Sequence, residues 1–122
     1  MSSTEIFHIT EPAVWHAAAA AGSFTESTRG KQLEEVGYIH CSFAEQVEMV
    51  ANFLYSDWDG GLVLLAIDAS CVPSEIRVEN LDGGEDQFPH IYGPVPLAAI
   101  TAVHDMTKRE EGWILPGELS LP

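Results

Sequence analysis

The sequence predicts one small domain of the α+β class, built on a mixed or antiparallel β-sheet with two main helices. The 122 residues are enough for one hydrophobic core and too few to divide comfortably into two. Hydrophobic residues make up 46% of the chain, which distinguishes it from disordered sequences. Several short runs alternate in the pattern of strands, and two longer segments carry helical start signals. A turn-rich stretch between two of the runs indicates an antiparallel hairpin.

The chain begins with a strand and a helix. Residues 5–10 alternate as a strand. Pro12 in a first helical turn and Gly22 at a natural stop then bound a helix. The mixed polar segment 23–36 is expected to be a loop with a short helical turn that ends near Gly37.

The middle of the chain again places a strand before a helix. Residues 38–41 alternate as a strand, and Ser42 and Glu45 form a capping box that starts a helix running to about Tyr55. The apolar run 62–67 is typical of a central strand that is buried on both faces. Further strands are expected at residues 76–79, over the extended run 88–94 and at residues 97–103, the first two of them pairing as the hairpin.

The C-terminal segment 104–122 is expected to be a poorly ordered tail outside a core of about residues 4–103. It contains two prolines and two glycines, and residues 113–115 are its only apolar anchor. Chain ends with so little apolar surface are rarely held in place.

The charge balance excludes polyanionic partners. Nineteen acidic residues against five basic ones give a formal net charge of −14. Since nucleic-acid affinity rests on Lys and Arg displacing counterions, we expect neither DNA, RNA nor anionic membranes as partners. A small molecule, or an amino group on a protein, fits this surface better.

Cysteine usage and the N-terminus predict a cytoplasmic protein. Cys41 and Cys71 form neither a metal-type pair nor a disulfide framework. The N-terminal residues lack the basic and apolar regions of a signal peptide, and no apolar run approaches the roughly twenty residues that span a bilayer. The sequence leaves the oligomeric state open.

Three of the five histidines lie in the middle of predicted strands, each with a polar or aromatic residue two positions away on the same face. If the strands are adjacent, these side chains converge on one polar patch, and the alternate residues meet on the opposite side as core. The polar set is His8 with Thr10, Tyr38 with His40 and Ser42, and His90 with Tyr92; the apolar set is Phe7, Ile9, Ile39, Cys41 and Ile91.

A patch of imidazoles has three chemical uses. Histidines hydrogen-bond a neutral polar ligand, transfer protons near neutral pH, or bind a divalent metal when three converge. A three-histidine zinc site would leave a fourth position for water. No histidine here belongs to a close metal-type pair, so a metal is the lesser interpretation and no metal ligand is predicted.

Four stretches of the chain together resemble the bacterial domain of unknown function 952 family. The resemblance covers nearly the whole chain up to about Val103, and its last motif is highly specific. That family is grouped with the ADP-ribosyltransferase-like fold, so the resemblance implies a split sheet. The stretches are residues 7–10 (FHIT), 37–42 (GYIHCS), 50–55 (VANFLY) and 88–94 (FPHIYGP).

The resemblance implies roles for the first two motifs. In one branch of that fold a His-x-Thr strand lies against the nicotinamide ribose of NAD, and His8 and Thr10 match it. A second strand leads into a helix and carries the tyrosine that stacks on nicotinamide. Tyr38 stands one position earlier than that tyrosine, so the stacking role falls to Tyr38 or His40.

The third motif departs from the family pattern. It begins with a catalytic glutamate in the transferases, and His90 stands in its place here. Glu79, on a neighbouring predicted strand, is the carboxylate expected to reach in. A diphosphate would be held by Arg29 or Lys31, or by the backbone N–H groups where the helix after Ser42 starts.

These observations support three hypotheses. The first is an ADP-ribosyltransferase-like transferase or glycohydrolase that uses NAD or a related small nucleotide as substrate, with no cofactor predicted with certainty. The second is a binding module for NAD or ADP-ribose that performs no chemistry, and the third is a metal-dependent hydrolase built on the three histidines. The candidate residues are His40, His90 and Glu79 for catalysis, and His8, Thr10, Tyr38, Ser42, Tyr92 and Arg29 for ligand binding.

Overall fold

The computed structural model describes residues 5–81 and 83–119. Its central layer is a three-stranded antiparallel sheet in the order β1-β6-β10, formed by β1 (Glu5–Thr10), β6 (Val63–Asp68) and β10 (Ile100–Asp105). The middle strand β6 is buried from Val63 to Ile67, as its continuous apolar run predicts. The expected strand at 97–103 begins as a 3₁₀ turn (Leu97–Ala99) and becomes extended only at Ile100.

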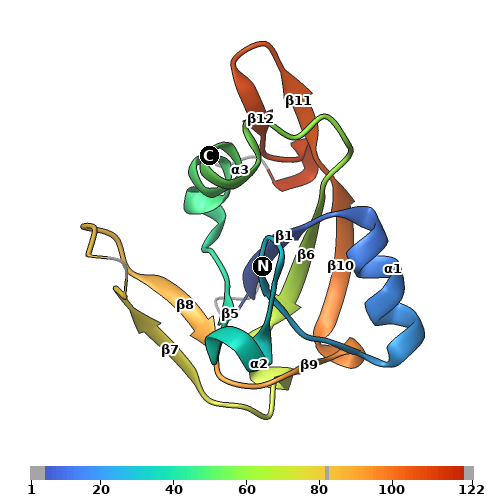
Figure 1. Ribbon diagram of the computed structural model, residues 1–122, viewed down its shortest axis with the longest axis vertical. Coiled ribbons are helices and arrows are strands. Elements are labelled where there is room, and N and C mark those ends of the chain that lie inside the picture. The colour runs from blue at the N-terminus through green and yellow to red at the C-terminus, as the bar shows by residue number, and fades with distance from the viewer. Residues whose placement is uncertain (1–4, 82, 120–122) are drawn as a thin grey trace.

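A second three-stranded antiparallel sheet has the order β5-β8-β7. It consists of β5 (Ile39–His40), β8 (Phe88–Ile91) and β7 (Ile76–Glu79), and β7 and β8 form the predicted hairpin. Figure 1 shows this hairpin extending from the body as an arm. An isolated bridge between Phe7 and Ser42 joins the two sheets, with each backbone N–H donating to the other residue's carbonyl at 2.8 Å.

The helices end where the glycines predict. Gly22, with φ of 96°, follows α1 (Pro12–Ala21), and Gly37, with φ of 100°, follows the short α2 (Leu33–Val36). The long helix α3 (Val47–Tyr55) follows a 3₁₀ turn (Ala44–Gln46). The described part of the chain has no helix that is long and apolar enough to cross a membrane.

The predicted capping box at Ser42 and Glu45 is wrong. Ser42 instead lies in the bridge to Phe7, so its backbone is extended and the helical geometry starts later. The Gln46 side chain accepts a hydrogen bond from the Phe43 backbone N–H at 3.0 Å, which gives one half of a capping box one residue further on, because the Phe43 side chain has no acceptor for the other half.

The segment 23–36 is not the expected loop, although its helical turn is confirmed as α2. The segment is mostly polar, so the strands of two or three residues within it show no alternation of apolar and polar residues in the sequence. One of them, β3 (Glu26–Thr28), contains the buried Glu26 and Ser27 and lies against β5 of the second sheet. The strands are β2 (Ser23–Phe24), which pairs with β9 (Val95–Pro96), and β3, which pairs with β4 (Lys31–Gln32).

The expected C-terminal tail is wrong for the residues described. Strands β11 (Thr107–Arg109) and β12 (Gly112–Ile114) form a hairpin, and a 3₁₀ turn (Gly117–Leu119) follows. Trp113 is only 3% exposed, and its indole N–H donates to the Tyr55 carbonyl at 2.9 Å. One large aromatic side chain therefore anchors a segment with little other apolar surface.

The core has two parts, one on each face of the central sheet, because alternate residues of β6 enter different clusters. Helix α1 packs on the first face through Ala18, and α3 packs on the second. The prediction that Phe7 and Ile9 share a core with the apolar residues of the other motifs is wrong. Phe7 and Ile9 lie with α3, whereas Ile39, Cys41 and Ile91 lie in the first cluster, because the three motifs belong to two sheets.

Asn52 joins α3 to β12 and gives a stability test of this hairpin. Its side-chain oxygen accepts from the Trp113 N–H at 2.7 Å, and its amide donates to the Trp113 carbonyl at 3.1 Å. An Asn52→Ala variant leaves both backbone groups of a buried residue without these partners. We expect it to lower the free energy of unfolding by about 1–3 kcal/mol, measured by urea denaturation. A loss below about 0.5 kcal/mol, the range of ordinary surface substitutions, would mean that the hairpin does not depend on Asn52.

Candidate functional site

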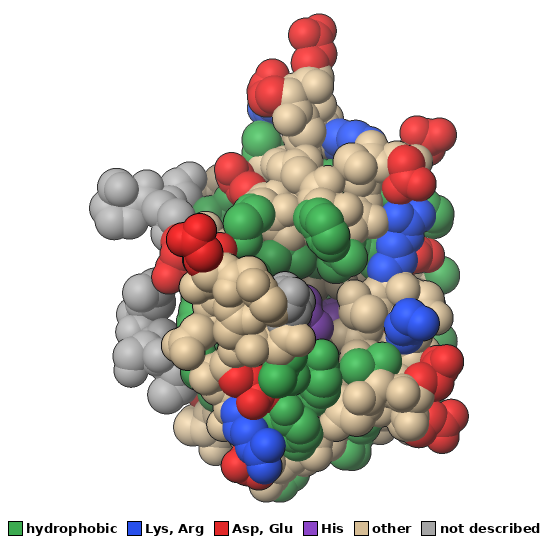
Figure 2. Space-filling view, turned by 60° about the vertical axis from the view of Figure 1, so that its left-hand side comes forward, with side chains coloured by type: hydrophobic (Ala, Val, Ile, Leu, Met, Phe, Trp, Pro, Cys, Tyr) green, Lys and Arg blue, Asp and Glu red, His purple; other side chains and the backbone are tan. Residues whose placement is uncertain are grey.

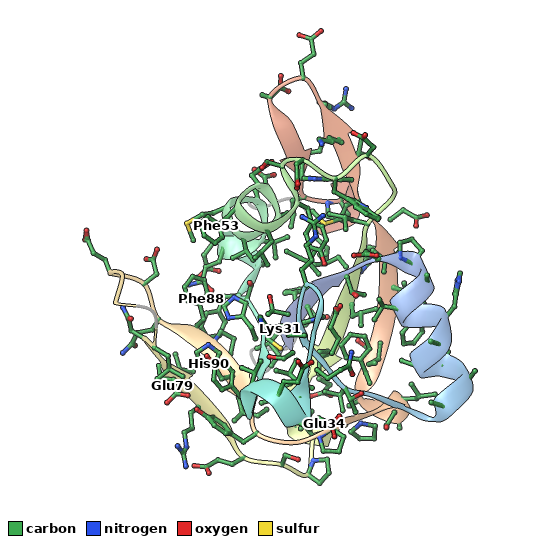
Figure 3. All side chains as sticks on the ribbon, in the orientation of Figure 1. Lys31, Glu34, Phe53, Glu79, Phe88 and His90 are labelled. Carbon is green, nitrogen blue, oxygen red and sulfur yellow. The ribbon has the colours of Figure 1, made fainter. Side chains whose placement is uncertain are left out.

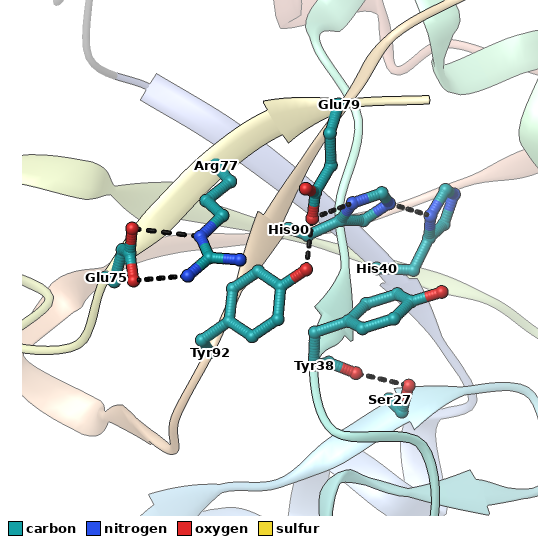
Figure 4. A network of polar contacts seen from close by, with 8 residues as sticks. All are labelled: Ser27, Tyr38, His40, Glu75, Arg77, Glu79, His90 and Tyr92. Atoms are coloured by element: carbon teal, nitrogen blue, oxygen red, sulfur yellow. Dashed lines mark hydrogen bonds and ion pairs between the residues drawn. The ribbon is translucent and has the colours of Figure 1, made fainter. Parts of the chain in front are cut away.

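A chain of hydrogen bonds runs across the second sheet from a carboxylate through two imidazoles. Glu79 Oε2 lies 3.2 Å from His90 Nδ1, and His90 Nε2 lies 3.3 Å from His40 Nδ1 (Figure 4). The register explains this proximity, because His40 pairs directly with His90 and side chains of paired residues lie on one face. Glu79 comes from β7, the strand on the other side of β8.

The carboxylate sets the direction of every hydrogen bond in this chain. An ionised Glu79 only accepts, so His90 donates from Nδ1. In a neutral ring the other nitrogen then accepts, so His90 Nε2 receives the proton of His40 Nδ1. If the His40 ring is also neutral, its atom without a proton is Nε2, the atom at which a neutral imidazole accepts a proton.

Tyr92 and Arg77 hold the Glu79 end in place. The Tyr92 hydroxyl donates to Glu79 Oε2, and the Arg77 guanidinium lies 4.6 Å above the Tyr92 ring while it bonds Glu75 through two nitrogens. The hydrogen bond from Tyr92 is the main cause that lowers the pKa of Glu79 below its ordinary value, and the hydrogen bond from His90 acts in the same direction. The same hydrogen bond raises the pKa of Tyr92.

A Tyr92→Phe variant tests the cause of this shift. Without the hydroxyl, the pKa of the Glu79 carboxyl should rise toward its ordinary value, measured by carbon-13 NMR titration. Because the folded pKa is lowered, the stabilisation is present above the ordinary glutamate pKa and is lost as the pH falls through the lowered pKa. Tyr38→Phe is the control, since the Tyr38 ring lies 5.6 Å from Tyr92 with no described bond to Glu79. An unchanged Glu79 titration in Tyr92→Phe would contradict this account.

His40 also lines a cavity of about 380 Å³ between α3 and the second sheet. Figure 2 shows a hollow in this face of the molecule with histidine inside and hydrophobic side chains around it. Figure 3 shows Phe53 on α3 and Phe88 on β8, with His90 and Glu79 further along the same side. The lining residues are Ser27, Thr28, Val36, Tyr38, His40, Met49, Val50, Phe53, Leu54, Gly84, Glu85, Asp86 and Phe88.

The aromatic rings next to the histidines pack closely. The Tyr38 ring lies 4.5 Å from the His90 ring, and the Phe88 ring lies 5.0 Å from the His40 ring. Ser27, which is fully buried, donates its hydroxyl to the Tyr38 carbonyl at 2.5 Å and so fixes the backbone of Tyr38 directly before β5, the strand that carries His40. Of the expected pocket residues, Tyr38 and His40 line this cavity, while His90 lies behind His40.

His8 and Thr10 belong to a separate buried cluster with Glu26. Thr10 Oγ1 donates to Glu26 Oε1 at 2.5 Å, and His8 Nε2 lies 3.2 Å from the same oxygen. His8 Nδ1 donates to the backbone carbonyl of His40 at 2.7 Å. The exposed fractions of His8, Thr10 and Glu26 are 3%, 0% and 3%. These residues support the β5 backbone beneath the cavity and are absent from its described lining.

Two further predicted ligand-binding residues are engaged elsewhere. Arg29 donates to the Leu54 carbonyl at 2.6 Å and to Asp57 at 2.9 Å, and its guanidinium stacks on the Tyr55 ring at 4.8 Å. Ser42 is 2% exposed and forms the bridge between the two sheets. Neither residue is among the described residues that line the cavity.

Sequence reasoning missed Glu26, Ser27, Glu85 and Asp86. Glu26 and Ser27 lie in a polar segment whose strands are too short to show a pattern, so nothing marked them as buried. Glu85 and Asp86 follow the turn signal before Phe88, where acidic residues are ordinarily solvent-exposed. Only the approach of α3 to this loop makes them part of a cavity wall.

The described residues contain no group of three or more His, Cys, Asp or Glu side chains arranged to hold a metal ion. Both ring nitrogens of His8 face partners within the chain, the His40 carbonyl and Glu26. Nδ1 of His40 faces His90. This geometry gives no support to the three-histidine metal site, and we do not propose it.

Comparison with known proteins places the chain in a family without an assigned activity. A family model described as a protein of unknown function, DUF952, matches residues 9–103. No curated protein matches. The crystal structure of protein CC0527 from Caulobacter crescentus is 33% identical, with a TM-score of 0.76 over 97% of this chain and all of that one. The solution structure of CC0527 is 32% identical, with a TM-score of 0.70 over 90% of each chain. The match to the family model and the similarity to CC0527 show that this chain belongs to the DUF952 family.

Proposed function

We propose that this protein is an enzyme that binds a small molecule in the cavity beside α3 and uses His40 as general acid and base. His90 and Glu79 act as positioning residues behind it. The observation that carries the proposal is the hydrogen-bonded chain from Glu79 through His90 to His40, which ends on a residue that lines the cavity.

The chemistry follows from how a carboxylate acts on linked imidazoles. Glu79 favours a positive charge on the two rings, so it supports the uptake by His40 of the proton lost by the nucleophile, a water or an acceptor group, as it bonds to the substrate and the leaving group departs. The bonds that fix Glu79 and His90 also fix the orientation of the His40 ring. The rings of Tyr38 and Phe88 beside it suit a planar heterocycle.

The substrate that we propose is NAD or a related small nucleotide, and the reaction is that of an ADP-ribosyltransferase-like transferase or glycohydrolase. The resemblance of the three motifs to that fold supports this. Cleavage of the nicotinamide–ribose bond builds positive charge on the ribose, and nearby carboxylates stabilise such a transition state. Glu79 is bonded to His90 and Tyr92, whereas Glu85 and Asp86 line the cavity, so these two take the electrostatic role in our proposal.

The experiment is incubation of the intact protein with NAD, followed by mass spectrometry for nicotinamide and ADP-ribose. A thermal-shift series with NAD and ADP-ribose is run in parallel, because ligand binding to the native state raises the melting temperature. We expect both stabilisation and product. Stabilisation without product would make the protein a binding module, and no stabilisation by either compound would exclude the nucleotide.

A further inference from the structure

The charge of the cavity wall indicates the charge of the ligand that the cavity binds. The described lining contains two carboxylates, Glu85 and Asp86, and neither Lys nor Arg. A wall of this kind repels the phosphate groups of a nucleotide and attracts a positive charge. The part of any ligand that enters the cavity is therefore not its anionic part.

Exposed apolar side chains at the cavity also indicate what kind of ligand it binds. Phe53 is 83% exposed and Met49 is 48% exposed, although both lie on α3, whose other face is buried in the core. Such exposure leaves Phe53 with little part in holding the fold together. Together with Tyr38 and Phe88, it gives the cavity three aromatic side chains and one soft thioether. The π faces of aromatic rings attract cations, and clusters of aromatic rings are the sites that recognise quaternary ammonium groups in proteins.

Most of the remaining charge of the molecule agrees with this preference, and the exposed Lys31, whose strand partner Thr28 lines the cavity, is the exception. The net charge is −14, so the surrounding field favours the approach of cations. Three of the five basic residues are held by contacts within the chain: Arg29 by Asp57, Arg77 by Glu75, and Lys108 by the carbonyls of Ser56 and Trp58.

We infer that the cavity binds an organic cation whose charge lies on an alkylated nitrogen, with the nitrogen among Tyr38, Phe53 and Phe88 and the charge facing Glu85 and Asp86. This inference rests on the ligand cavity of the proposed function, but it concerns the charge of the ligand and not its conversion.

The test compares choline with 3,3-dimethyl-1-butanol, its neutral analogue in which carbon replaces the charged nitrogen. Binding of each to the intact protein is followed by NMR titration. We expect choline to bind about tenfold more tightly, and its affinity to fall with added sodium chloride because salt screens the carboxylates. Equal or tighter binding of the neutral analogue would overturn the inference.

Two sets of variants test separately how the two carboxylates and the Phe53 ring contribute to choline binding. The double variant Glu85→Gln and Asp86→Asn should abolish most of the preference for choline over the neutral analogue. Phe53→Leu should weaken choline binding several-fold, and the protein should stay folded because Phe53 is exposed. The control is Glu110→Gln with Glu111→Gln, exposed carboxylates in the turn between β11 and β12. A preference that persists in the cavity double variant would contradict the role of these carboxylates. Choline is not a substrate of the proposed reaction, so loss of NAD turnover and loss of cation binding are distinguishable.

Discussion

Replacing Glu26 by alanine is expected to lower the free energy of unfolding by about 3–5 kcal/mol, measured by chemical denaturation. Glu26 is 3% exposed, and its Oε1 atom is the partner of both His8 and Thr10. His8 donates from Nδ1 to the His40 carbonyl, so one proton lies between His8 Nε2 and Glu26, and the pair as a whole is neutral. Removing the carboxyl leaves two buried polar side chains without their partner.

The matched control is Glu34→Ala on α2, an exposed glutamate whose loss should change stability by less than about 0.5 kcal/mol. Glu26→Gln keeps an acceptor for Thr10, so its loss in the free energy of unfolding should lie between those of Glu26→Ala and Glu34→Ala. If Glu26→Ala were no more destabilising than Glu34→Ala, the buried cluster would not be a support of β5 and the cavity floor.

A His40→Asn variant is expected to lower kcat for the proposed reaction by a factor on the order of 10²–10⁴, the usual contribution of general acid–base catalysis. The fold should persist, because the contact of His8 is with the backbone carbonyl of residue 40 and not with its ring. Steady-state kinetics with NAD and thermal denaturation measure the two effects separately. His16→Asn, at an exposed position of α1, is the control and should leave both unchanged.

Glu79→Gln separates positioning from catalysis in the same assay. Glutamine keeps an acceptor for Tyr92 and His90 but removes the negative charge that favours proton uptake by the two rings. We expect a smaller loss in kcat than for His40→Asn, with the acidic limb of the activity shifted to lower pH, because the neutral His40 ring is the form that takes up a proton. A uniform loss at every pH would contradict a role for Glu79 through the histidines.

The sequence predicts that His40 and His90 share one face if their strands are adjacent, and in the structure the two residues pair directly. Each stands two positions from a tyrosine in an extended run, and alternation places each histidine on the same face as its neighbour. Glu79 is predicted from the same pattern, because the turn-rich residues 80–87 indicate that β7 and β8 pair. These contacts depend on strand register, and period-2 alternation determines register wherever a run is long enough to show it.

Packing between separate elements is the part that alternation does not determine. His8 has the same local pattern as His40, yet β1 belongs to the other sheet and His8 faces Glu26 instead of the cavity. Whether a polar strand residue reaches a cavity depends on which sheet it joins. Phe53 and Asp86 come from a helix and a loop that only tertiary packing brings to the same wall. Trp113 likewise contributes one buried ring in a segment whose composition is typical of an unstructured end.

The central claim is that Glu79 orders the protons of His90 and His40, and nitrogen-15 NMR of the imidazole rings tests it directly. At a pH at which both rings are neutral, the account predicts a proton on Nδ1 of His90 and on Nδ1 of His40, with His40 Nε2 unprotonated. A neutral His40 with its proton on Nε2 would contradict the account, because His40 could not then donate to His90 and the chain from Glu79 to the cavity would be broken.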